Sequence, residues 1–242
     1  MLLYGKNSVR ERLKTNPASV KKIFLQDNFA QADIIELIDL NKIAIERLPS
    51  HRLRRIKRAD NLGGIVARID EFAYLPFDRL LDLSQDKKPT IIFLDRICDP
   101  QNLGSIMRTA ACLGGLSLVI PESKACRVNE TVLHVAAGGE NYISVSVVSN
   151  MLKAVLAAKD CGYWIAGAAL GGGVRQDIRN VSLPFPLGVV LGSEGFGIRC
   201  GIDKHLDIKV HIPMEGRGLS FNVNIACAIV CYEIFRQGRG DR

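Results

Sequence analysis

The sequence has few aromatic residues and no hydrophobic run long enough to cross a membrane. Aromatic side chains make up 6% of its 242 residues, with a single tryptophan. No apolar stretch reaches the roughly 18 residues that a membrane-spanning helix needs. The opening residues, MLLYGKNSVR, turn polar too soon for a signal peptide. We therefore expect a folded, cytoplasmic protein with no membrane partner.

The seven cysteines form neither a disulfide framework nor a metal site. Their number is odd, no CxxC pair occurs, and most lie in apolar stretches, so we expect buried, reduced thiols. Cys227 and Cys231 share a predicted helix, but no histidine or third cysteine nearby completes a ligand set. The four histidines show no HExxH spacing. The sequence thus predicts no metal.

Positive charge is in excess, with a formal net charge of +7. This excess favours a polyanionic partner, although a merely basic surface has the same net charge. Residues 51–58 read HRLRRIKR, in which only leucine and isoleucine separate the basic side chains. Such a cluster does not belong in a core. The candidate polyanion-binding residues are Arg52, Arg54, Arg55, Lys57 and Arg58.

Alternating helix and strand patterns place a small α/β unit at the N-terminus. The expected elements are a helix from Asn7 or Ser8 to before Pro17, strands at 21–26, 43–48 and 64–69, and a helix at 32–42. The pattern weakens between Glu71 and Pro89, where DLSQDKKP indicates a linker. We predict an N-terminal domain over 1–76, a linker over 77–88 and a second domain over 89–242.

The second domain has the pattern of a parallel sheet covered by helices on both faces. Short apolar runs recur along it, several of them separated by helix-length segments. The predicted strands are 90–94, 116–120, 143–148, 163–168, 187–191 and 208–212. The predicted fold class is therefore α/β.

The first segment with candidate functional residues is LDRICDPQNLGSIMRTAACLGG, residues 94–115. A strand ends there in a polar turn, and a helix starts near Asn102. The free N–H groups of a helix N-terminus can bind an anion, and Arg108 follows one and a half turns later. A capping asparagine with a surface arginine would give the same pattern.

The second segment, GVVLGSEGFG at 188–197, is a buried strand that runs into a glycine-rich turn with one carboxylate, Glu194. Glycine lets a backbone approach a ligand closely, but a plain tight turn has the same composition. No phosphate loop or early GxGxxG fingerprint is present. A conventional Rossmann enzyme is therefore disfavoured.

The third segment, residues 210–233, ends a strand at Pro213 and begins a long apolar helix. Ser220, Asn222 and Asn224 crowd the start of this helix. A helix needs only one N-cap, so the crowding favours a functional role.

In this order, the three segments resemble the motifs of the SpoU (TrmH-like) family of RNA 2′-O-ribose methyltransferases. NLGSIMRTA, LGSEGFG and IPMEGRGLSFNVNIACAI carry the resemblance, which covers about residues 89–235. Through LYGKNSVRERL and NLGGIVARI, the N-terminal unit is similar to a ribosomal-protein-like RNA-binding domain. That domain belongs to the subgroup that methylates a guanosine of large-subunit (23S) rRNA.

The resemblance implies a SPOUT-type trefoil knot, S-adenosylmethionine as cofactor, an RNA substrate, and a homodimer with the last helix, residues 222–235, as a candidate contact. The implied catalytic residues are Arg108, Asn102, Glu194, Ser220 and Asn222. The implied cofactor-binding residues are Gly192, Ile212, Phe221, Ala168 and Met214, with 168–172 as a further wall. The family usually has leucine where Phe221 stands.

The role of Arg108 meets a physical difficulty if it is described as a base. The pKa of arginine lies above about 12, so a neutral guanidine is costly at pH 7. We expect Arg108 instead to bind an RNA phosphate and to stabilise the developing alkoxide, while positioning supplies much of the rate.

Three alternatives remain at this stage. In the first, the acceptor ribose belongs to tRNA, although the extra N-terminal domain favours rRNA. A non-catalytic RNA-binding protein could keep the knot, but it would not need the full set of catalytic residues. An unrelated basic enzyme acting on nucleotides is disfavoured by the missing phosphate loop.

Overall fold

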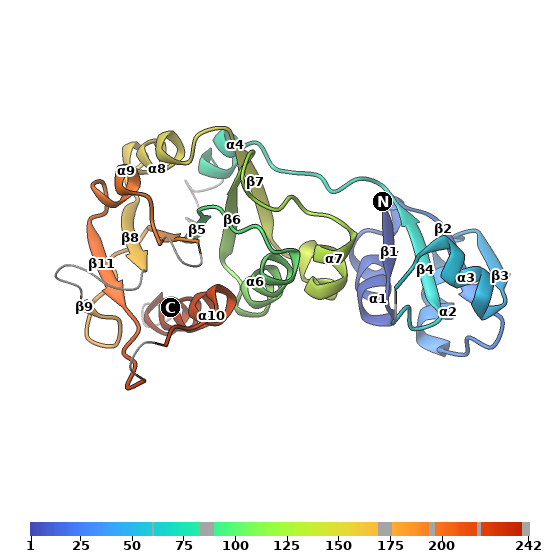
Figure 1. The fold of residues 1–242 in the computed structure, drawn as a ribbon. Helices are drawn as coiled ribbons and strands as arrows, with labels where there is room; N and C mark the ends of the chain where they lie inside the picture. The colour runs from blue at the N-terminus through green and yellow to red at the C-terminus, as the bar shows by residue number, and fades with distance from the viewer. Residues whose placement is uncertain (60, 83–89, 169–175, 194–196, 217–218, 239–242) are drawn as a thin grey trace. The chain divides into compact units, whose positions relative to one another are not determined.

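The computed structural model describes residues 1–59, 61–82, 90–168, 176–193, 197–216 and 219–238 (Figure 1). The chain divides into two compact units. Unit 1 comprises Met1–Ala73 and Val128–Tyr142, and unit 2 comprises Tyr74–Arg127 and Ile143–Arg242. Each unit is built from its own sheet and helices.

Unit 1 contains a four-stranded sheet in the order β1-β4-β2-β3. Strands β1 and β2 pair antiparallel with β4, and β3 pairs parallel with β2. The elements are β1 (Leu2–Tyr4), α1 (Lys6–Thr15), η1 (Pro17–Ser19), β2 (Val20–Gln26), α2 (Ala32–Leu40), β3 (Ile45–Leu48), α3 (Ser50–Ile56), β4 (Ile65–Ile69), α7 (Glu130–Ala136) and η2 (Gly139–Asn141). The predicted helices and strands of this region are all present, and β1 and α3 are additional.

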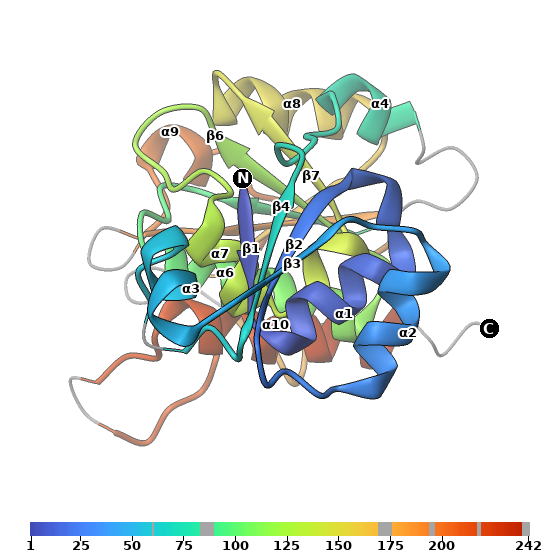
Figure 2. The same cartoon turned by 90° about the vertical axis from the view of Figure 1, so that its right-hand side faces the viewer.

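Alternating side chains let the unit 1 sheet bury both of its faces. Helices α1 and α2 cover one face and α3 covers the other (Figure 2). On the α3 side, Tyr4, Phe24 and Val66 point from neighbouring strands into a buried cluster with Leu53 of α3. Helix α3 therefore buries its leucine and leaves its basic residues on the outer side.

Segment 128–142 joins unit 1 through its contacts with β1 and α1. The ring of His134 stacks on Tyr4 at a centroid distance of 4.2 Å. The Glu130 carboxylate accepts a hydrogen bond from the Leu2 N–H at 2.7 Å and another from Lys57 Nζ. The predicted division of the chain lacks this segment, because local periodicity does not report which distant residues pack together.

Unit 2 contains a seven-stranded sheet in the order β7-β6-β5-β10-β8-β11-β9. All of its pairings are parallel, as predicted. The elements are α4 (Phe77–Asp82), β5 (Thr90–Leu94), α6 (Pro100–Leu113), β6 (Leu116–Pro121), β7 (Ser144–Val148), α8 (Met151–Asp160), β8 (Trp164–Ala168), β9 (Gln176–Asp177), β10 (Leu187–Leu191), α9 (Cys200–Asp203), β11 (Ile208–His211) and α10 (Val223–Gly238). The six predicted strands are present, β9 is additional, and α4 occupies part of the predicted linker.

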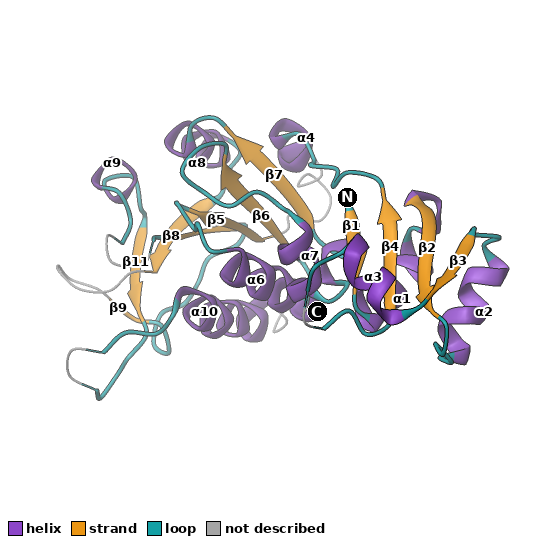
Figure 3. Cartoon of the chain, turned by 45° about the vertical axis from the view of Figure 1, so that its right-hand side comes forward, coloured by secondary structure: helices purple, strands orange, loops and turns teal. Residues whose placement is uncertain are grey.

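Helices cover both faces of the unit 2 sheet, which confirms the predicted α/β class. Helices α4, α8 and α9 lie on one face, and α6 and α10 pack together on the other (Figure 3). Every residue of the central strands β5 and β10 is buried, which explains their continuous apolar sequences. Among the helices that the structure describes, none is long and apolar enough to span a bilayer.

The expectation that the cysteines are buried holds for Cys227 and Cys231 and is wrong for most of the others. Cys98, Cys112, Cys161 and Cys200 are exposed, and Cys126 is half-buried. Several of these residues lie in loops or at helix ends, where an apolar neighbour in sequence does not imply burial.

A buried ion pair in unit 1 makes the stability of the folded chain depend on pH. Arg12 Nη2 lies 3.2 Å from Glu140 Oε1, and the Glu140 side chain has no exposed surface. Burial raises the pKa of Glu140 above its ordinary value of 4.5, although backbone groups and Arg12 oppose the shift. The folded protein therefore holds a proton on Glu140 at a pH where the unfolded chain has lost it.

We expect the Glu140→Gln variant, which does not titrate at this position, to reveal this linkage. The free energy of unfolding of the wild type minus that of the variant should rise as the pH falls from 7 to about 4.5, by about 1.4 kcal/mol for each pH unit that separates the pKa of Glu140 in the folded chain from that in the unfolded chain. Urea denaturation across this range measures the difference. A difference that stays flat or declines toward acid pH would show that Glu140 titrates normally in the fold.

Candidate functional site

The carboxyl ends of four neighbouring strands lie at one edge of the unit 2 sheet. Leu94 of β5 is in register with Leu191 of β10, which aligns with Ala168 of β8. Ala168 aligns in turn with Val210 of β11. Ligands of parallel α/β sheets bind at this kind of edge. The predicted cofactor residues Ala168, Gly192 and Ile212 therefore lie at or just beyond adjacent strand ends.

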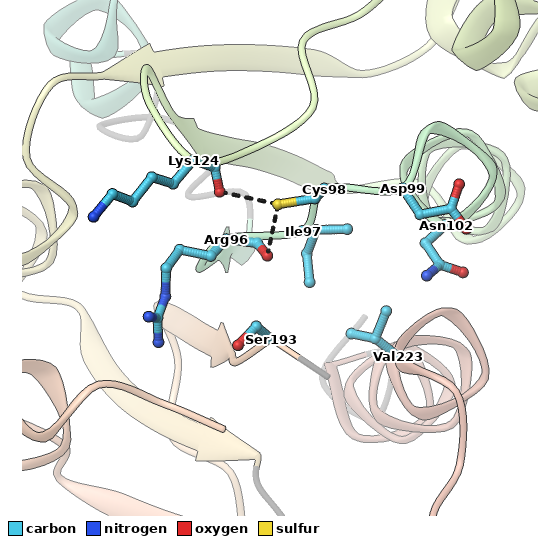
Figure 4. Close-up of a pocket in the computed structure, with 8 residues that line it drawn as sticks. All are labelled: Arg96, Ile97, Cys98, Asp99, Asn102, Lys124, Ser193 and Val223. Atoms are coloured by element: carbon cyan, nitrogen blue, oxygen red, sulfur yellow. Dashed lines mark hydrogen bonds between the residues drawn. The ribbon is translucent and has the colours of Figure 1, made fainter. Parts of the chain in front are cut away.

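A cavity of about 370 Å³ lies beside the ends of β5 and β10 (Figure 4). It is lined by Arg96, Ile97, Cys98, Asp99, Asn102, Lys124, Ser193 and Val223. Asn102, Ser193 and Val223 come from the three segments that the sequence singled out. The structure thus brings these segments together, although they are far apart along the chain.

Asn102, in the first turn of α6, lines the cavity and is not the N-cap of the helix. The N-cap of α6 is Asp99, whose side chain accepts a hydrogen bond from the Gln101 N–H at 2.8 Å. The helix therefore begins at Pro100, slightly earlier than predicted. Asn102 is only 4% exposed. The alternative of a capping asparagine is wrong, because Asp99 already fills that role.

Arg108 lies on the same helix but not on the cavity wall. Its side chain is exposed, and within the described part of the chain no hydrogen bond or ion pair involves it. Six residues correspond to one and two-thirds turns of helix, so Arg108 points in a different direction from Asn102. In this chain alone, Arg108 does not reach the cavity lining.

The turn after β10 needs glycine at position 192 for its own geometry. A Cβ atom on Gly192 would lie 2.1 Å from the carbonyl carbon of Gly197. Gly197 N–H also donates to Ser193 O at 3.0 Å, which closes the turn. The Ser193 hydroxyl is buried and has no partner among the described groups. The catalytic candidate Glu194 lies outside the described residues.

The start of α10 uses only one of its three polar residues as a cap. The Asn222 side chain accepts a hydrogen bond from the Asn224 N–H at 3.0 Å. The backbone carbonyl of Asn222 accepts another from the Ala226 N–H at 2.9 Å. Ser220 is exposed. Asn224 has a buried Oδ1 without a described partner, so it is, like Ser193, a buried polar group that the predicted catalytic set does not include.

The remaining predicted cofactor residues lie near the strand ends. Ile212 follows β11 and is half-buried, as is Ala168. Met214 is 38% exposed and Phe221 is 40% exposed, and both belong to the segment between β11 and α10. Residues 169–172 of the predicted wall lie outside the described residues.

An ion pair that sequence reasoning missed holds two of the motif segments together. Asp95, which directly follows β5, has no exposed surface. Arg199 Nε donates to its Oδ2 at 2.9 Å, and Arg199 Nη2 lies 2.7 Å from its Oδ1. The pair connects the loop before α6 with the segment after β10. An aspartate at the end of an apolar strand was the available signal.

In unit 1, the basic cluster is mostly free of internal ion pairs. Arg52, Arg54, Arg55 and Arg58 are exposed, and the described structure gives none of them an acidic partner. Lys57 is instead paired with Glu130, and its ammonium lies 5.1 Å from the centroid of the Tyr4 ring. Burial opposes this pairing, yet the hydrogen bonds from Lys57 and Leu2 lower the pKa of Glu130 below its ordinary value.

No group of three potential metal ligands occurs among the residues that the structure describes. Beside the apolar side chains of Ile97 and Val223, the described groups that line the cavity are two cations, an amide, a hydroxyl, a thiol and one carboxylate. Such a set suits binding of an anion or a polar organic molecule.

Two family models match the chain. That of the SpoU rRNA Methylase family covers residues 89–232, and that for RNA 2′-O ribose methyltransferase substrate binding covers residues 2–75. A protein from Staphylococcus saprophyticus named as a TrmH family tRNA/rRNA methyltransferase is 31% identical over 242 residues, which are 98% of this chain and 96% of the relative. YacO of Bacillus subtilis, which is also named as a TrmH family tRNA/rRNA methyltransferase, is 32% identical over 238 residues. These residues are 96% of this chain and 94% of YacO.

The fold is also similar to that of a solved methyltransferase structure. The SpoU methyltransferase AviRb from Streptomyces viridochromogenes, crystallised with AdoMet, superposes with a TM-score of 0.81 at 20% identity, over 99% of this chain and 91% of that one. This likeness concerns the fold alone. Together with the family matches over both parts of the sequence, it leads to one assignment: the chain belongs to the SpoU rRNA methylase family of RNA methyltransferases.

Proposed function

We propose that this enzyme transfers a methyl group from S-adenosylmethionine to a ribose 2′-hydroxyl of RNA, at a guanosine of large-subunit rRNA. The observation that carries the proposal is the cavity at the sheet edge, where Asn102, Ser193 and Val223 of the three family motifs meet. The proposal includes the trefoil knot, a cytoplasmic site of action, and an RNA-binding domain (1–76), a linker (77–88) and a catalytic domain (89–242) whose segment 128–142 packs into unit 1.

The residues at the strand ends fit the proposed cofactor. Ala168, Gly192 and Ile212 offer backbone groups at adjacent strand ends, and Met214 and Phe221 offer exposed apolar side chains for an adenine ring. When bound, the sulfonium supplies an activated methyl group together with its own leaving group. The chain's own residues then have to bind the RNA, orient the ribose and stabilise the 2′-oxygen while its proton passes to solvent.

Each catalytic candidate has a specific role in this proposal. Arg108 stays positively charged and stabilises the negative charge that develops on the 2′-oxygen. Asn102 faces the cavity from α6 and orients the ribose by hydrogen bonding. Glu194, Ser220 and Asn222 complete the surroundings of the ribose or orient Arg108. Positioning supplies the remainder of the rate.

The exposure of Arg108 and of α10 supports a homodimer. Ile225 is 48% exposed and Tyr232 is 60% exposed, and their spacing of two turns places them on one face of α10. Large apolar side chains of this kind are typical of an interface. A second copy that packs on α10 would cover this face and bring Arg108, on the adjacent α6, toward the subunit boundary.

RNA binding by unit 1 is supported by α3. Its exposed arginines face outward, away from the buried Leu53, and residues 2–75 match the substrate-binding family model. A tRNA substrate is the second candidate, because the names of the relatives include both tRNA and rRNA. Mapping 2′-O-methyl groups in both RNAs, from cells with and without the gene, distinguishes the two.

We expect Arg108→Ala to reduce methyl transfer by at least about 100-fold, because the transition state loses a charge that stabilises the alkoxide. Transfer of labelled methyl groups to rRNA measures the rate, and calorimetry with S-adenosylmethionine checks that the site is intact. Arg79→Ala, which removes an exposed arginine of α4, is the control. Near-normal turnover of Arg108→Ala would refute the assigned role.

We expect Tyr232→Glu to convert the dimer to a monomer, because a carboxylate would be desolvated within the interface. Light scattering coupled to gel filtration measures the mass. Tyr142→Glu changes a tyrosine of unit 1 that is 56% exposed and serves as the matched control. A dimer that survives Tyr232→Glu would mean that α10 is not the contact.

We expect Arg54→Glu combined with Arg55→Glu to weaken rRNA binding and to flatten its dependence on salt, because fewer phosphates are neutralised. Arg79→Glu combined with Lys153→Glu makes the same charge change in unit 2. If the two double variants bind rRNA equally well, the RNA docks away from α3.

A further inference from the structure

Segment 197–199 contacts the ends of two strands that carry predicted cofactor residues. A Cβ atom on Gly192, just beyond β10, would lie 2.4 Å from the backbone nitrogen of Ile198. A Cβ atom on Gly167, in β8, would lie 2.9 Å from Cδ1 of Ile198. Because glycine lets another part of the chain approach closely, segment 197–199 packs directly on the sheet edge, at Gly192 and beside Ala168.

Arg199, the last residue of this segment, extends the contact to a third strand. Its Nε donates to Asp95 Oδ2 at 2.9 Å, and its Nη2 lies 2.7 Å from Asp95 Oδ1. Asp95 directly follows β5, and its side chain has no exposed surface. A planar guanidinium that faces both carboxylate oxygens fixes direction as well as distance. One short segment thus touches the ends of β5, β10 and β8.

The sheet itself does not depend on this ion pair. The Asp95 N–H donates to Leu191 O at 2.9 Å, which continues the pairing of β5 with β10 through backbone groups. Arg96 Nε lies 3.8 Å from Asp95 Oδ2, so the carboxylate keeps a positive neighbour if Arg199 is replaced. We therefore expect loss of the Arg199 side chain to loosen segment 197–199 on the sheet edge while the fold stays intact.

A second ion pair of unit 2 lies away from the strand ends that carry the predicted cofactor residues. Lys159 Nζ of α8 lies 2.6 Å from Asp207 Oδ1, and Asp207 Oδ2 accepts a hydrogen bond from the Ile165 N–H at 2.8 Å. Asp207 precedes β11, and Ile165 lies near the start of β8. This pair is therefore at the amino ends of the strands, on the opposite edge of the sheet from Asp95, and it offers a matched control.

We propose that Arg199 is a positioning residue for the methyl donor. Through Asp95 it holds segment 197–199 against the ends of β10 and β8, and so keeps the backbone groups of Gly192 and Ala168 at the spacing that S-adenosylmethionine binds. Arg199 acts through these contacts and not on the reacting atoms. The inference rests on the proposed function, in which Gly192 and Ala168 bind the cofactor.

The test compares Arg199→Gln with Lys159→Gln, each of which removes the cation of one ion pair in unit 2. Arg199→Lys keeps the charge but replaces the planar fork by a single nitrogen. Calorimetry measures the affinity for S-adenosylmethionine. The affinity for large-subunit rRNA without cofactor, the KM and kcat of methyl transfer, and the thermal midpoint are measured on the same proteins, with rRNA from cells that lack the gene.

We expect Arg199→Gln to weaken S-adenosylmethionine binding by about tenfold, the scale of one hydrogen bond between charged groups. The KM for the cofactor should rise with it, while kcat at saturating cofactor and the affinity for rRNA stay within about twofold, because only the binding of the cofactor is lost. Arg199→Lys should fall between Arg199→Gln and the wild type. Lys159→Gln should bind the cofactor as the wild type does, even if its thermal midpoint falls.

A double-mutant cycle tests whether Arg199 acts through Asp95. Asp95→Asn keeps the shape of the side chain and removes its charge. If the two residues act as a pair, Arg199→Gln should weaken cofactor binding much less in the Asp95→Asn background than in the wild type. Arg199→Lys keeps the inference open to refutation if the Asp95→Asn protein does not fold.

Three results would overturn the inference. One is wild-type affinity for S-adenosylmethionine in Arg199→Gln. Another is an equal loss of cofactor affinity and thermal stability in Arg199→Gln and Lys159→Gln, which would make the effect a general one of broken ion pairs. The third is a fully additive cycle, which would separate Arg199 from Asp95. A wild type that binds the cofactor but methylates no rRNA would instead contradict the proposed acceptor, and cofactor binding would still decide the role of Arg199.

Discussion

The buried carboxylate of Asp95 is the constraint on which the arrangement of the cavity depends. An ion with no exposed surface is costly unless a partner compensates it, and Arg199 does so from a segment about a hundred residues away in sequence. The pair holds the loop that follows β5 against the segment that follows β10. This electrostatic contact between distant parts of unit 2 therefore helps to fix the walls of the cavity, together with backbone hydrogen bonds such as that from the Asp95 N–H to Leu191 O.

The parallel pairing of the strands brings the other cavity residues to the same edge of the unit 2 sheet. Because β5, β10, β8 and β11 run in the same direction and in register, the segments that follow them emerge at one edge. Asn102, Ser193 and Val223 therefore line one cavity although they lie far apart in the sequence. A family whose motifs are widely spaced along the chain is a natural result of such a sheet.

Periodicity and composition predicted the parallel sheet of unit 2 and most of unit 1, because buried strands such as TIIFL and LGVVL are apolar throughout. They could not predict which distant segments pair. Asp95 with Arg199, and α7 with β1, are contacts between residues far apart in sequence. The burial of the cysteines was misjudged for a related reason, since apolar neighbours describe a segment and not the face on which a side chain lies. The sequence placed Asn102 near the start of a helix and, through the family resemblance, among the catalytic residues, but only the structure shows that Asp99 caps the helix.

The assignment of residues 128–142 to unit 1 bears on how this protein can be divided. The chain leaves unit 2 after β6, contributes α7 and η2 to unit 1, and returns for β7. A single cut after residue 76 would thus remove Tyr4, Lys57 and Arg12 from His134, Glu130 and Glu140. The remaining piece would keep a helix that has lost its neighbours. Loss or exchange of the N-terminal domain during evolution would require compensating changes in this helix. We therefore expect residues 1–73 and 128–142 to change together during evolution.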